Sequence, residues 1–148
     1  MNEIRKVSVV VPVFNEEGNV EPLVEEIAAV MNQQNPEWEL WLVDDGSTDA
    51  SLARIRTVCE REPHAGFLSF RRNRGQSAAF GAGFEAATGD VIVTLDADLQ
   101  NDPADIPTLL DMYRQGFDMV IGWRVTRRDD SARRFASRVG NAVRNALP

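Results

Sequence analysis

Two aspartates one residue apart, Asp96 and Asp98, directly follow the apolar run of residues 91–95. If that run is a β-strand, both carboxylates lie just past its end, where the chain turns and both can reach one cation. Carboxylate oxygens with open coordination positions suit Mg²⁺ or Mn²⁺, with substrate phosphates completing the shell. Gln100 could add a carbonyl oxygen. The spacing predicts a divalent-cation site; the alternative is an acidic loop that caps the next helix and contacts only water.

A second acidic pair, Asp44 and Asp45, follows the mainly apolar stretch of residues 38–43 and precedes Gly46, which permits a tight turn. One of these carboxylates is predicted to accept hydrogen bonds from a base or a ribose. The alternative is that it caps the next helix, a role for which residues 47–49 are also suited.

Basic residues offer partners for phosphates. Arg71, Arg72 and Arg74 precede a predicted helix start and could neutralise a diphosphate, or pair with surface acids in an exposed loop. Arg124, just past residues 119–122, is the stronger phosphate candidate because of its position. His64 lies in a polar turn and is predicted to be exposed and without a role.

Alternating strands and helices must bring these residues together. Short apolar runs predict strands over residues 7–13, 38–43, 67–70, 91–95 and 119–122, and the first of these is β-branched and nearly continuous. Apolar spacing predicts helices over residues 16–33, after 47–49, and over 76–88, 106–113 and 133–147. Gly81 and Gly83 predict that the helix over 76–88 packs closely against the sheet and is buried. The fold class is therefore α/β, with a mainly parallel sheet flanked by helices.

In such sheets ligands bind beyond the carboxyl ends of the strands. The acidic residues 16, 17, 44, 45, 96 and 98 all follow predicted strands, as does Arg124. This clustering is the main indication of a binding site that the residues themselves provide.

Composition is that of a soluble globular domain: 148 residues, 43% hydrophobic and 26% charged. No signal peptide or membrane helix is predicted, and a single cysteine, Cys59, indicates a reducing, cytoplasmic setting. The net charge of −7 is uneven, because residues 123–148 carry seven arginines against two aspartates and leave −12 on residues 1–122. The acidic body argues against nucleic-acid binding. The basic segment could meet phosphates or an anionic membrane surface, or could be a solvated helix face.

Taken in their order along the chain, the motifs resemble those of family 2 glycosyltransferases of the GT-A, Rossmann-like fold. The resemblance is greatest to the dolichyl- and undecaprenyl-phosphate sugar transferases. The resemblance covers nearly the whole chain. It rests on residues 9–16, 43–49, 72–73 with Gly75, 81–89, 96–100 with residues 102–103, and 122–124.

The resemblance implies a UDP- or GDP-sugar donor bound by residues 1–122, the nucleotide-sugar-binding core. Pro12, Phe14, Glu16 and one of Asp44 or Asp45 would line the nucleoside pocket; Phe14 stands where relatives often have tyrosine. Asp96, Asp98 and Gln100 would hold Mg²⁺ or Mn²⁺, and Asp98 and Arg124 would be catalytic. The remaining substrate contacts would be Asn73, Gly75, Gln76 and Ala97.

The implied reaction is inverting transfer to a polyprenyl phosphate or another glycan acceptor, at the cytoplasmic face of the membrane. Residues 123–148 would then face the acceptor or the membrane. Relatives continue well past residue 148, so the fold is expected to be truncated at its C-terminus, and a non-catalytic nucleotide-binding fragment is the main alternative. A phosphatase with an aspartate nucleophile in the D-x-D motif is disfavoured, because such enzymes tend to carry the motif on the first strand.

Overall fold

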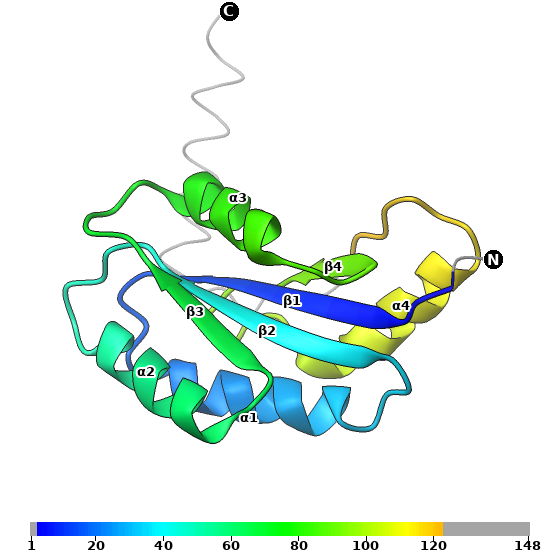
Figure 1. The fold of residues 1–148 in the computed structure, drawn as a ribbon, viewed down its shortest axis with the longest axis horizontal. Helices are drawn as coiled ribbons and strands as arrows, with labels where there is room; N and C mark the ends of the chain where they lie inside the picture. Colours follow the sequence, from blue (N-terminus) through cyan, green and yellow to red (C-terminus); the bar gives the residue numbers. More distant parts are fainter. Residues whose placement is uncertain (1–2, 123–148) are drawn as a thin grey trace, which may run out of the picture.

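Four parallel strands form the sheet in the computed structural model, which describes residues 3–122 (Figure 1). The strand order is β3-β2-β1-β4, so that β1 lies between β2 and β4. The strands are β1 (Lys6–Val13), β2 (Glu37–Asp44), β3 (Ala65–Ser69) and β4 (Val91–Thr94). This confirms the α/β class and the first four predicted strands.

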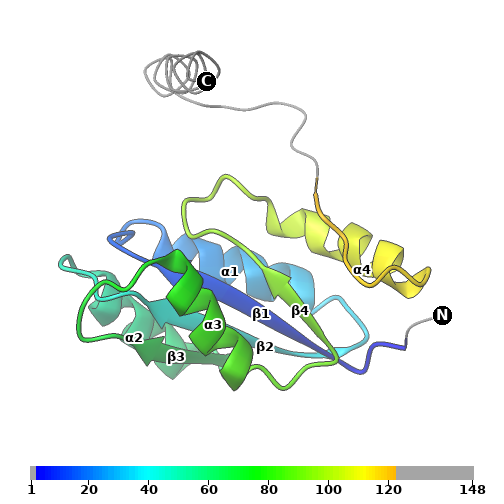
Figure 2. The same cartoon turned by 90° about the horizontal axis from the view of Figure 1, so that it is seen from above.

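Helices cover both faces of the sheet. Helices α1 and α2 lie on one face and α3 lies on the other, while α4 lies on the same side as α1 (Figures 1 and 2). Their bounds are α1 (Val20–Met31), α2 (Ser51–Arg61), α3 (Gln76–Ala86) and α4 (Ile106–Arg114), the last preceded by a short 3₁₀ helix η1 (Pro103–Asp105). No helix among residues 3–122 is long and apolar enough to cross a membrane.

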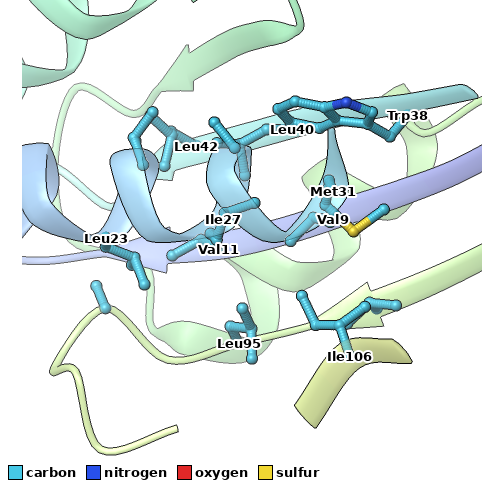
Figure 3. Packing of buried hydrophobic residues seen from close by; sticks show 14 of the residues in the cluster. Val9, Val11, Leu23, Ile27, Met31, Trp38, Leu40, Leu42, Leu95 and Ile106 are labelled. Carbon is cyan, nitrogen blue, oxygen red and sulfur yellow. The ribbon is translucent and has the colours of Figure 1, made fainter. Parts of the chain in front are cut away.

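The core lies between the sheet and α1. Seven of the eight residues of β1 are buried, because a central strand with helices on both faces has no solvated side. The apolar stripe of α1 packs on this face together with the first turn of α4 (Figure 3). Its buried members recur at the helical spacing of three and four, and are Val20, Leu23, Val24, Ile27, Ala28 and Met31.

The glycines of α3 differ in their packing. A Cβ added at Gly83 would lie 2.3 Å from Val10 Cγ1, so this glycine lets the helix approach β1 closely. A Cβ at Gly81 would meet nothing within 4 Å. Only Ala79 and Gly83 are buried in α3, and Phe84 is 44% exposed. The prediction of a buried helix is therefore wrong: α3 packs on the sheet by one narrow face.

Two predicted elements differ from the structure. Residues 119–122 form no strand, and Met119 and Ile121 are 76% and 79% exposed. A strand needs a neighbour for its N–H and C=O groups, and no described strand pairs with this segment. Helix α1 begins at Val20 instead of residue 16, because Asn15 has a positive φ of 55° and starts a loop. The helix predicted over residues 133–147 lies outside the described residues.

A half-buried carboxylate ties the segment between α3 and β4 to the sheet near the amino ends of the strands. Glu39 accepts hydrogen bonds from Lys6 Nζ at 2.7 Å, Ser8 Oγ at 2.6 Å and the Thr88 N–H at 2.7 Å. Burial acts to raise the pKa of Glu39, but these hydrogen bonds outweigh it and lower the pKa from 4.5 to about 2. The ionised form therefore stabilises the fold.

Acid is expected to destabilise the chain through Glu39. Because its folded pKa of about 2 lies below the unfolded value of 4.5, its contribution is present above pH 4.5 and is lost as the pH falls from 4.5 towards 2. The shift corresponds to about 3 kcal/mol at most. Urea unfolding of the unsubstituted chain and of Glu39→Gln, at several pH values, measures this. The difference between them should shrink as the pH falls, and a constant difference would contradict the assignment.

Candidate functional site

The carboxyl ends of all four strands lie at one edge of the sheet, because the strands are parallel. This edge carries the acidic residues that follow β1, β2 and β4. Because β1 lies between β2 and β4, the loops after these strands are spatial neighbours. The structure thus gathers Glu16, Asp44, Asp45, Asp96 and Asp98 along one edge, where parallel sheets bind ligands.

The loops after β1 and β2 are joined by hydrogen bonds. Asn15 N–H donates to Ser47 Oγ at 3.0 Å, and Thr48 N–H donates to Asn15 Oδ1 at 2.8 Å. The left-handed conformation of Asn15 is one that asparagine tolerates well. Glu16 N–H donates to the Oγ of buried Ser51 at 2.8 Å. The loops after β1 and β2 therefore hold each other in place at this edge of the sheet.

Asp44 and Asp45 are almost completely buried and bind other parts of the protein. Asp44 accepts from Ser47 N–H at 3.1 Å and from Ser69 Oγ at 2.9 Å. Asp45 accepts from the N–H groups of Arg74 and Gly75 at 2.7 and 2.9 Å, one with each oxygen. Both carboxylates thus hold loops together. A direct contact of either with a nucleoside stays a prediction.

The loop after β4 presents Asp96, Asp98 and Gln100 at the surface. Asp96 is half-buried, whereas Asp98 and Gln100 are exposed. Asp98 Oδ1 accepts from Gln100 N–H at 3.1 Å. Leu99, between them, has a positive φ of 58°, a conformation that is rare for a branched residue and that concentrates at functional sites.

These residues fit a cation that shares its coordination shell with a substrate. No lysine or arginine among residues 3–122 forms an ion pair with Asp96 or Asp98, so their negative charge is uncompensated by the described protein. No group of three or more acidic, histidine or cysteine side chains in this part of the chain could hold a metal by itself. Two carboxylates on one loop suit Mg²⁺ or Mn²⁺ when phosphate oxygens supply further ligands.

The other predicted site residues occupy different environments. Pro12 is buried within β1, and Ala97 packs in the core. Phe14 is 43% exposed at the end of β1, and Glu16 Oε2 accepts from Asn19 Nδ2 at 2.6 Å. Asn73 is exposed on the loop of residues 71–75. Arg124 lies outside the described residues.

The arginine loop leaves its cations open to solvent. Arg71 and Arg72 are exposed and form no ion pair with a described carboxylate. Arg74 stacks its guanidinium over Phe70, with the Arg74 Cζ atom 6.0 Å from the ring centre. Of the two alternatives for this loop, the structure disfavours pairing with surface acids.

The sequence did not reveal one contact of the site. Gln76 Nε2 donates to Asp96 Oδ1 at 2.7 Å, from the first residue of α3 to the loop after β4. The predicted helix start before residue 76 was the available signal, but it does not give the direction of the side chain.

Two hollows lie at the amino ends of the strands, at the edge opposite Asp96 and Asp98. Two open hollows of about 430 and 450 Å³ share Lys6, Asn35, Pro36 and Glu37 in their linings. One of them is also lined by His64, which stacks on Trp38 with ring centres 4.3 Å apart. His64 is thus exposed, as predicted, but it packs on a core residue. We place the candidate site at the opposite edge of the sheet, because the residue types there suit binding and catalysis, whereas the hollows are indicated by their shape alone.

The sequence pattern described as Glycosyl transferase family 2 matches residues 8–145. The chain belongs to this family. Among its relatives, this family 2 chain is 49% identical over 126 residues to a dodecaprenyl-phosphate galacturonate synthase of Rhizobium johnstonii, covering 84% of the chain and 37% of the relative. It is 43% identical over 144 residues to an undecaprenyl-phosphate 4-deoxy-4-formamido-L-arabinose transferase of Pectobacterium carotovorum subsp. carotovorum, covering 97% and 44%. The chain thus spans less than half of these relatives.

Solved structures show the same fold for this family 2 chain. A mannosyltransferase from Pyrobaculum calidifontis in complex with GDP-Man and Mn²⁺ is 29% identical with a TM-score of 0.60, covering 70% of this chain and 30% of that one. Glucosyl-3-phosphoglycerate synthase from Mycobacterium tuberculosis in complex with UDP is 28% identical with a TM-score of 0.62, covering 76% and 41%. The expected GT-A fold is confirmed.

Proposed function

We propose that this chain binds a nucleotide-sugar donor and serves a metal-assisted, inverting transfer of the sugar to a polyprenyl phosphate. The observation that carries the proposal is the acid pair Asp96 and Asp98, which forms no ion pair with a lysine or arginine among residues 3–122. The pair lies at a sheet edge where the neighbouring loops carry the buried carboxylates of residues 44–45 and the exposed arginines 71 and 72. Identity of 43% and 49% to two polyprenyl-phosphate sugar transferases supports the acceptor class.

Each group of residues has a proposed task. Phe14, Glu16 and Asn73 contact the nucleoside, within the loops that Asp44 and Asp45 hold in place. Asp96 and Asp98, with Gln100, hold Mg²⁺ or Mn²⁺ on the diphosphate. A bound divalent cation supplies Lewis-acid stabilisation of the departing nucleoside diphosphate. The exposed Arg71 and Arg72 add positive charge near the donor phosphates.

The acceptor needs little help from a general base. A phosphomonoester has a second pKa of about 6, so a polyprenyl phosphate is mostly ionised near neutral pH. This agrees with the composition of the site, because the single histidine, His64, stacks on Trp38 at the other end of the sheet. The work of the protein is to position donor and acceptor in line.

The segment of residues 123–148 is proposed to face the acceptor or the membrane. Its seven arginines suit an anionic acceptor or the anionic surface of the cytoplasmic face of a membrane. Within it, Arg124 is proposed to contact phosphate.

Thermal unfolding with UDP and with GDP, each with and without Mn²⁺ or Mg²⁺, tests donor binding. A ligand at 100 times its dissociation constant stabilises the fold by ~2.7 kcal/mol, which gives a visible rise in melting temperature. We expect a rise in melting temperature that needs both nucleotide and metal and that disappears in Asp98→Ala. The rise should persist in Asp118→Ala, a control that removes an exposed acid from the segment after α4. Whether UDP or GDP stabilises the chain identifies the base of the donor.

Two results would change the proposal. A chain that neither nucleotide stabilises has no working donor site. A chain that binds donor with metal but transfers no sugar to a polyprenyl phosphate is the nucleotide-binding module of a transferase, which is the second candidate.

A further inference from the structure

The Asp96 carboxylate has one hydrogen-bond donor among residues 3–122, the side-chain amide of Gln76. The distance from Gln76 Nε2 to Asp96 Oδ1 is 2.7 Å, and the two residues come from different elements. Oδ2 of Asp96 has no partner in this part of the chain. One oxygen is therefore held by the protein while the other remains available.

The backbone turn before Gln76 is fixed from another strand. Gly75 has φ 92° and ψ 153°, a conformation that residues with a Cβ avoid, and it directly precedes α3. Its N–H and that of Arg74 are held by the two oxygens of Asp45, which is 2% exposed at the end of β2. The Gln76 side chain that reaches Asp96 thus follows a turn whose backbone is held by the buried carboxylate of Asp45.

A neutral amide suits this position. Gln76 orients the carboxylate without adding charge, so that Asp96 keeps its attraction for a cation; a lysine or arginine there would compete with the cation. Groups that hold metal ligands in this way raise affinity because the ligand does not have to be ordered on binding.

We propose that Gln76 is a positioning residue, which orients Asp96 towards the divalent cation, and that Asp45 positions Gln76 through the turn at Gly75. The inference rests on the proposed function of the acid pair as a metal site. It gives Gln76 a role different from direct contact with the donor, which is the alternative for an exposed amide at a helix start.

The test compares Gln76→Leu, which keeps a side chain of similar volume but removes the amide donor, with Ser77→Ala. Ser77 is the next residue of α3, is exposed and has no hydrogen bond of its side chain in the described structure. Two affinities are measured by calorimetry for each chain: that of Mn²⁺ in the presence of saturating nucleoside diphosphate, and that of the nucleotide without metal. Melting temperatures without ligand report on folding.

We expect Gln76→Leu to bind Mn²⁺ about 10- to 100-fold more weakly. Its metal-free nucleotide affinity and its melting temperature should match those of the unsubstituted chain, and Ser77→Ala should match in all three. Unchanged Mn²⁺ affinity in Gln76→Leu, or an equal loss of metal-free nucleotide affinity, would overturn the positioning role while leaving the donor site intact. Absence of Mn²⁺-dependent binding in the unsubstituted chain would instead overturn the donor site and the inference together.

Discussion

Replacing Gly46 with alanine is expected to lower the free energy of unfolding by about 3 kcal/mol. Gly46 has a φ of +70°, where a side chain is strained. A Cβ there would also lie 2.4 Å from the carbonyl carbon of Arg72 and 2.6 Å from the Asn73 nitrogen. Because both neighbours are backbone atoms, no side-chain rotation relieves the contact. Urea unfolding measures the loss.

Gly18→Ala is the matched control for this change. A Cβ at Gly18 meets nothing within 4 Å and its φ is not positive, so the substitution should leave stability nearly unchanged. Nucleotide binding by Gly46→Ala should weaken as well, because the clash displaces the loop of residues 71–75. A Gly46→Ala chain with the stability of Gly18→Ala would show that the two loops do not approach as described.

Asp45→Ala is expected to cost about 3 kcal/mol or more. The change removes two hydrogen bonds to a charged acceptor, each of which contributes about 1.5–3 kcal/mol. It leaves the Arg74 and Gly75 N–H groups without their partner. The free energy of unfolding of Asp45→Asn, which keeps one acceptor oxygen, should lie between those of the unsubstituted chain and Asp45→Ala. Chemical denaturation measures the series.

An exposed acid provides the comparison for Asp45. Asp111, with its side chain 69% exposed, pairs with Arg114 within α4. Such a surface pair contributes at most ~1 kcal/mol, so Asp111→Ala should have a small effect. Equal effects of Asp45→Ala and Asp111→Ala would mean that the buried carboxylate does not stabilise the loop of residues 71–75.

The strands were predictable where the local signal and the tertiary context agree. Apolar runs located β1, β2 and β4 to within about one residue, and those of β1 and β4 are rich in β-branched residues. The run of residues 119–122 carries a similar local signal but forms no strand, because pairing depends on a neighbour and not on composition. The start of α1 was missed because side chains 30 or more positions away, such as Ser47 and Ser51, bind the backbone of residues 15–16.

The gathering of the acids at one edge of the sheet was predictable, but their contacts were not. The position of acids after strands, with the resemblance to a family, identified the edge of the sheet at which Asp96 and Asp98 lie. Side-chain direction depends on turns that the sequence does not display. Asp45, one of the two carboxylates considered for contact with a ligand, also holds residues 74–75, and Gln76 reaches Asp96 from the turn at Gly75. These interactions join segments 20 to 30 positions apart.

The central place of β1 has a consequence for the order in which the protein assembles. Lys6 pairs with Glu37, 31 positions later, whereas Val7 pairs with Val91, 84 positions later. Closing the longer loop costs more chain entropy, and on a ribosome β4 is synthesised last of the four strands. We therefore expect β1, β2 and β3 to form first with α1 and α2. The acid pair after β4 would join them late, so that the edge proposed to bind the metal is completed only in the final stage of folding.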